Sequence, residues 1–214
     1  MLDWTELLDW SEYTKLLAGL LAIVNPFSKI PVFLSLSKNL TPAETHRIAL
    51  ITSLAVIVTL SLFTFFGEAL LDLFGITIEA FRIAGGILLL LISLEMMRSQ
   101  PDTPKPGGSI PSEKTSIAIV PLAIPLSAGP GAISTIIVYA HRHESLDHDL
   151  LVNGVIICVA IVLFFALRLA PTMGAKLGKT GMNVFNRIMG LIIAAIAVEF
   201  IIDGLAIHFP GLLQ

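Results

Sequence analysis

Apolar residues gather in long runs that carry few charges. Six such runs cover residues 14–36, 48–66, 82–97, 117–140, 150–167 and 187–202. About 20 consecutive apolar residues are enough for a helix to cross a bilayer. The pattern therefore predicts an all-α integral membrane protein with six transmembrane helices.

Prolines and glycines interrupt the first and the fourth of these runs. The first contains Asn25, Pro26, Phe27, Ser28 and Pro31, and the fourth contains Pro125, Ser127, Ala128, Gly129, Pro130 and Gly131. Each proline removes a backbone donor and clashes with the preceding turn, so we expect discontinuous helices 1 and 4. Inside a membrane, unpaired backbone groups are tolerated where they line a protein cavity, so these residues are the candidate binding site. A pair of merely kinked structural helices is the alternative.

The two halves of the sequence resemble each other. Pro26 and Pro31 recur 99 positions later as Pro125 and Pro130, and residues 75–85 resemble residues 181–190 with one gap. Spans 1–3 therefore match spans 4–6. Because each repeat has an odd number of spans, the second copy must be inverted, as in many secondary transporters.

The repeat also sets the expected domain organisation. We expect an interfacial helix over residues 2–12 and the first repeat within 1–98. Residues 99–115 hold four prolines and two adjacent glycines, which predicts a mobile linker. The second repeat then occupies 116–214.

Composition supports a membrane protein and excludes several other classes. Of the 214 residues, 55% are hydrophobic and 14% are charged, against about 25% charged in soluble domains. The net charge of -3 and the absence of a basic patch speak against a nucleic-acid partner. Ten of the 13 lysines and arginines, with Lys29 among them, fall on one predicted face, which the positive-inside rule makes cytoplasmic. Both termini are then expected outside.

The broken helices suit a small zwitterion. A half-helix starting at Pro130 or Gly131 offers amide groups to a carboxylate. A half-helix ending near Val24 or Ile124 offers carbonyl groups to an ammonium group. Asn25, Ser28 and Ser127 can add side-chain hydrogen bonds, and the small residues Gly129, Gly131 and Ala132 favour a small substrate. Their size fits glycine, alanine or serine.

Two acids and one histidine-rich loop are further candidates for functional chemistry. Glu95 and Glu199 lie late in spans 3 and 6, where they either relay coupling protons or extend to the interface. His141, His143, Asp147 and His148 match no zinc spacing, so we expect no metal and no cofactor. The spans show no nucleophile–base pattern, so we expect no enzyme. A non-transporting scaffold or an intramembrane enzyme is the alternative to a carrier.

Several motifs together resemble one known family. They are Asn25-Pro26 with Pro31, residues 81–86, Pro125 and residues 129–132. With these motifs the sequence looks like the MarC family of bacterial and archaeal inner-membrane proteins, along essentially its whole length. That family includes SnatA-type carriers of small neutral amino acids, typically glycine and alanine. The resemblance implies six membrane helices, a place in the inner membrane and amino-acid transport.

Overall fold

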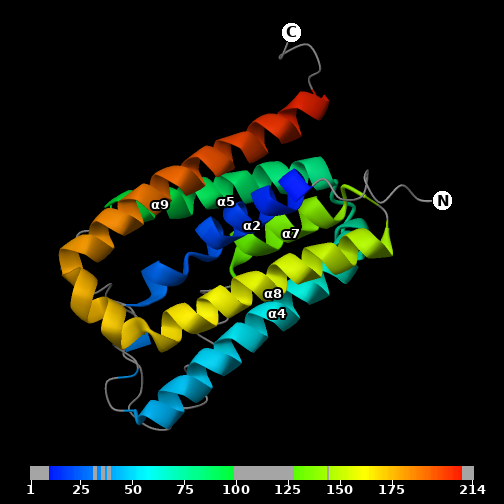
Figure 1. Cartoon of the computed structure of the whole chain (residues 1–214). Coiled ribbons are helices and arrows are strands. Elements are labelled where there is room, and N and C mark those ends of the chain that lie inside the picture. Colours follow the sequence, from blue (N-terminus) through cyan, green and yellow to red (C-terminus); the bar gives the residue numbers. More distant parts are fainter. Residues whose placement is uncertain are drawn as a thin grey trace.

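All of the regular structure in the described part of the chain is helical. The computed structural model describes residues 10–30, 33–34, 37, 40–98, 128–143 and 145–208. Its elements are α2 (Trp10–Val24), the 3-10 helix η1 (Pro26–Lys29), α4 (Pro42–Leu73), α5 (Ile78–Arg98), α7 (Pro130–Ala140), α8 (Leu146–Arg168) and α9 (Ala170–His208). Figure 1 shows them as one bundle, with α2 and α7 between the α5–α9 pair and the α4–α8 pair.

Local sequence explains where α4 begins and where α9 bends. At the start of α4, the Thr41 side chain accepts from Glu44 N, and the Glu44 carboxylate accepts from Thr41 N at 2.8 Å. Together with Pro42 in the first turn, this is the capping box that the sequence predicts. Gly178 has φ 59° and interrupts the helical geometry of α9, a backbone conformation that glycine tolerates.

The helices of the first half pack antiparallel against helices of the second half. At the α5–α9 crossing, a Cβ atom on Gly86 would lie 2.8 Å from Ala197 O, and one on Gly190 would lie 3.1 Å from Ser93 O. The residue numbers run in opposite directions, so the two helices are antiparallel. The small glycines let the two backbones approach closely, as is common between membrane helices.

The outer surface of the bundle is strongly apolar. Large hydrophobic side chains are exposed along α4, α5, α8 and α9, with Val58 and Leu191 about two-thirds exposed. In the part of the chain that the structure describes, four helical segments are long and apolar enough to cross a membrane: Pro42–Leu73, Ile78–Arg98, Leu146–Arg168 and Thr180–Ile207. A soluble surface rarely carries apolar patches of this extent, so the fold is that of an integral membrane protein.

The observed helices agree with the expected spans at the two breaks and differ from them at the end of span 2. The break after the first half of span 1 is present, because α2 ends at Val24, and a half-helix begins at Pro130 as expected. The acidic residues Glu68 and Asp72 belong to α4 itself, which extends beyond the predicted end of span 2 at residue 66. Of the predicted interfacial helix at 2–12, residues 10–12 form the first turn of α2, and the remainder lies outside the described residues. The linker 99–115 and the first half of span 4 also lie outside them.

Candidate functional site

The first break is built around Asn25, which has left-handed backbone geometry. Its φ is 41°, and its side-chain oxygen accepts a hydrogen bond from Ser28 N at 3.3 Å. Asparagine tolerates this conformation better than most residues because its short amide can bond locally. The residue thus ends α2 and starts η1 within the buried part of the bundle.

Lys29 hydrogen-bonds to the last carbonyl of α2. Its side chain is buried, with 8% exposed, and its Nζ donates a hydrogen bond to the carbonyl oxygen of Val24. Within the described part of the chain, no carboxylate forms an ion pair with Lys29. A buried cation with no anionic partner is costly unless something else supplies the negative charge.

The short helix η1 is held against α9 by two side chains. The rings of Phe27 and Phe185 meet edge to face with centroids 4.7 Å apart, and the Ser28 hydroxyl donates to Asn186 Oδ1 at 2.8 Å. Phe27 and Ser28, both predicted to line the binding site, therefore face α9 in this conformation. Pro26 is buried beside them.

The second break provides the start of α7. Gly129 is its N-cap with φ -67°, Pro130 is its first residue, and no side chain of the described residues caps its amides. The first turn closes with a bond from Ile133 N to Gly129 O at 3.1 Å. An uncapped helix start leaves amide donors and a partial positive charge. Ala128 is buried just before this turn, and Ser127 lies outside the described residues.

The two breaks lie next to each other. A Cβ atom on Gly131 would lie 3.5 Å from Ile23 Cγ2 and 2.4 Å from Leu89 Cδ2. The carbonyl end of α2 and the amide end of α7 are therefore neighbours, as a zwitterion site needs. The space beside Gly131 is filled by Leu89 of α5, so this glycine also serves close helix packing.

Two buried polar atoms near these breaks have no hydrogen-bond partner among the described residues. They are Asn25 Nδ2 and Ser134 Oγ, on residues that are 4% and 1% exposed. Ser134 lies one turn into α7, where a Cβ atom on Gly85 would fall 1.8 Å from its hydroxyl. Buried polar groups are almost always hydrogen-bonded, so an orphaned pair calls for a partner. A polar ligand would supply one.

The predicted coupling acids lie elsewhere. Glu95 on α5 and Glu199 on α9 are both exposed on the outer faces of their helices. Arg82 pairs with Asp203 of α9 at 3.5 Å, which explains how a charge is accommodated early in α5. Among the described residues there is no group of three side chains suited to hold a metal ion.

A cluster of charged residues joins three helices at the Glu12 end of the molecule, where α2 begins and α7 ends. Arg142 Nη1 lies 2.7 Å from Glu12 Oε1, and His143 lies 3.4 Å from its other oxygen. Partial burial alone would raise the pKa of Glu12, but hydrogen bonds and charge from Arg142 and His143 outweigh it and lower the pKa. Tyr13 and the buried His148 add a bond of 2.7 Å between α2 and α8.

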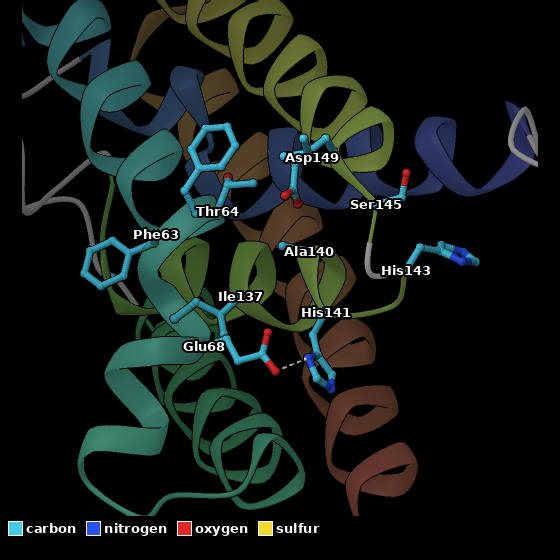
Figure 2. A pocket seen from close by; sticks show the side chains of 11 residues that line it. Phe63, Thr64, Glu68, Ile137, Ala140, His141, His143, Ser145 and Asp149 are labelled. Atoms are coloured by element: carbon cyan, nitrogen blue, oxygen red, sulfur yellow. Dashed lines mark ion pairs between the residues drawn. The ribbon is translucent and has the colours of Figure 1, made fainter.

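A cavity of about 300 Å³ opens at the same end. Figure 2 shows Glu68 of α4 reaching His141, whose Nδ1 lies 3.0 Å from Glu68 Oε1, while Asp149 of α8 and Thr64 line the opposite wall. A wider cavity of about 950 Å³ lies at the His46 end, where α4 begins and α8 ends. Residues of the two breaks line neither cavity.

Sequence reasoning missed Lys29 and Asn186 as members of this site. Lys29 was counted with the cytoplasmic charges, whereas it is buried at the break. The signal was available, because a lysine within an otherwise uncharged run is a functional candidate by default. Asn186 carried no comparable signal, since only the folded chain brings it to Ser28.

Known proteins resemble this chain over almost its full length. The membrane protein YhcE of Escherichia coli strain K12 is 41% identical over 209 residues, covering 96% of this chain and 97% of the relative. The membrane protein YvbG of Bacillus subtilis is 35% identical, covering 91% and 94%. The archaeal membrane protein MJ1677 of Methanocaldococcus jannaschii is 36% identical, covering 92% and 98%. No solved structure matches.

The family model described as "MarC family integral membrane protein" matches residues 10–209. This span takes in both helix breaks and every helix of the bundle. With bacterial and archaeal relatives above 30% identity along nearly the same length, the chain belongs to the MarC family of integral membrane proteins.

Proposed function

We propose that this protein is a secondary transporter of small neutral amino acids, with glycine, alanine and serine as substrates. The observation that carries the proposal is the meeting of the two breaks. The carbonyl end of α2 at Val24 and the uncapped amide end of α7 at Gly131 are adjacent and buried. Opposite partial charges at this spacing complement the ammonium and carboxylate groups of one small zwitterion.

The arrangement of the helices supports an inverted repeat of six spans. Gly86 and Gly190 are 104 positions apart, and so are Ser93 and Ala197. The Gly86–Ala197 contact is therefore repeated, with the roles exchanged, by the Gly190–Ser93 contact. Such reciprocity is what a two-fold axis between the halves produces. A cavity at each end of the bundle fits alternating access.

The proposal includes a place and an orientation. The family resemblance favours the inner membrane, and the excess of lysine and arginine on one face favours both termini outside. In Figure 1 the start of α2 and the end of α9 lie toward the same end of the bundle, which fits an even number of crossings. Coupling to protons through Glu95 or Glu199 is part of the same proposal.

Uptake into proteoliposomes tests the proposal. Labelled glycine should accumulate only in vesicles that contain the protein, and an imposed proton gradient should increase the uptake. Glu95→Gln and Glu199→Gln should alter the dependence on the gradient while glycine still binds. A protein that takes up neither glycine nor alanine, with or without a gradient, would favour the scaffold or enzyme alternative.

A further inference from the structure

Among the described residues, the carbonyl of Val24 is the one hydrogen-bond partner of the buried Lys29 Nζ. No carboxylate of the described residues pairs with it. The two α9 side chains seen to contact η1, Phe185 and Asn186, are an aromatic ring and an amide and carry no charge. The bond to Val24 offsets part of the cost of burial but leaves the charge without a counter-ion. The described residues therefore provide no negatively charged partner for Lys29.

The carbonyl that Lys29 occupies is also the one that a substrate ammonium group needs. Val24 is the last residue of α2, and its carbonyl lies at the negative end of the helix. A free amino acid carries both an ammonium group and a carboxylate on the same carbon. Such a molecule can take over the Val24 carbonyl with one group and meet the Lys29 ammonium with the other.

We propose that Lys29 is the carboxylate-binding residue of this site, and that a free α-amino acid binds by inserting between Lys29 and Val24. The substrate ammonium replaces Nζ as the donor to Val24 O, and the substrate carboxylate accepts from Nζ. The Lys29–Val24 bond is then the closed form of the empty site. This inference rests on the proposed function and specifies its substrate class as zwitterions with both charges intact.

The alternative role of Lys29 is structural, since lysines near helix C-termini often bond the last carbonyls. The two roles differ in their effect on ligand selectivity. A structural lysine would lower protein stability when replaced but would leave the preference among ligands unchanged. A carboxylate-binding lysine would determine which ligands bind at all.

The test measures ligand-induced thermal stabilisation of the purified full-length protein in detergent. The probes are glycine, methylammonium, which has only the positive charge, and acetate, which has only the negative one. For the wild type we expect stabilisation by glycine at concentrations at least tenfold below those needed of methylammonium or acetate. Equal effects of glycine and methylammonium on the wild type would overturn the proposal, and so would no effect of glycine.

Three variants complete the test. Lys29→Met keeps the length of the side chain without its charge, and we expect glycine to bind about 10- to 100-fold more weakly, the loss of one charge-assisted hydrogen bond. Lys29→Arg should retain most of the preference for glycine. Lys15→Met, at an exposed position on α2, is the matched control and should bind as the wild type does.

Wild-type glycine affinity in a folded Lys29→Met protein would overturn the proposal. If that variant does not fold, the three-probe comparison on the wild type decides by itself. Because binding is measured without transport, a protein that binds glycine through Lys29 but takes up none would contradict the proposed function alone.

Discussion

The breaks at Asn25 and at Gly129 lie side by side, but their free backbone groups differ in whether side chains hydrogen-bond to them. At the first, the Asn25 side chain bonds Ser28 N, and Lys29 bonds the carbonyl of Val24. At the second, Gly129 has no side chain to offer, and the described residues provide no cap for the first amides of α7. Within the described residues, the first break is thus satisfied by its own side chains, whereas the first amides of α7 have no side-chain cap.

Because of this difference, the two breaks would bind different groups of a ligand. A competing ammonium group can replace Lys29 as the donor to the Val24 carbonyl. An amide end without a cap attracts an anion directly. The proposed zwitterion would meet both breaks, with its ammonium at the Val24 carbonyl and its carboxylate at the amides of α7.

The largest effect is expected from Gly131→Val, which disturbs the break at Gly129. A Cβ atom there would lie 2.4 Å from Leu89 Cδ2, so α7 or Leu89 must move. Overpacking of this kind costs about 1–3 kcal/mol, and we expect glycine binding to be lost. Thermal unfolding and glycine binding in detergent measure the two effects.

The double variant Gly131→Val/Leu89→Ala serves as the control for packing. It should be more stable than the two single changes predict, because alanine makes room for valine. Glycine binding should stay lost, since the branched side chain still crowds the amides. Recovery of binding together with stability would show that Gly131 serves packing alone.

A smaller effect is expected at the break at Asn25. Asn25→Ala loses both the acceptor for Ser28 N and the tolerance for φ 41°, so we expect about 2–3 kcal/mol of lost stability. Asn25→Gly keeps the left-handed backbone and should lose about 1 kcal/mol or less. Denaturant unfolding of the two variants measures the difference, and equal losses would mean that the backbone conformation contributes nothing.

The positions of the helix breaks could be predicted from the sequence because proline and glycine act locally. Pro26 ends a helix and Pro130 begins one whatever surrounds them. The capping box at Thr41 is equally local. The glycine-rich contacts of α5 and α9 could be anticipated only as a resemblance between two segments, since their pairing arises in the folded bundle.

The partners of polar side chains could not be predicted, because they come from distant positions. The Ser28 hydroxyl donates to Asn186, 158 residues away, a partner that the sequence does not indicate, and its role in substrate binding stays a prediction. Lys29 was expected at the cytoplasmic face because positive-inside counting treats each lysine as a surface charge. Its burial depends on the backbone turning at Asn25, which brings Nζ back to the end of α2.

The finest test adds a cap to the break at Gly129. Gly129 has φ -67° and ψ 173°, a conformation that suits serine at a helix N-cap. Gly129→Ser should raise stability by a few tenths of a kcal/mol, because its hydroxyl can accept from a free amide of α7. The same hydroxyl competes with the substrate carboxylate, so we expect roughly threefold to tenfold weaker glycine binding, equivalent to about 0.6–1.4 kcal/mol.

Thr41→Gly, at the start of α4, is the matched control: it should lose stability and leave glycine binding unchanged. Unaltered glycine binding in a stabilised Gly129→Ser protein would mean that the amides of α7 do not receive the carboxylate, and would leave Lys29 as its sole proposed partner.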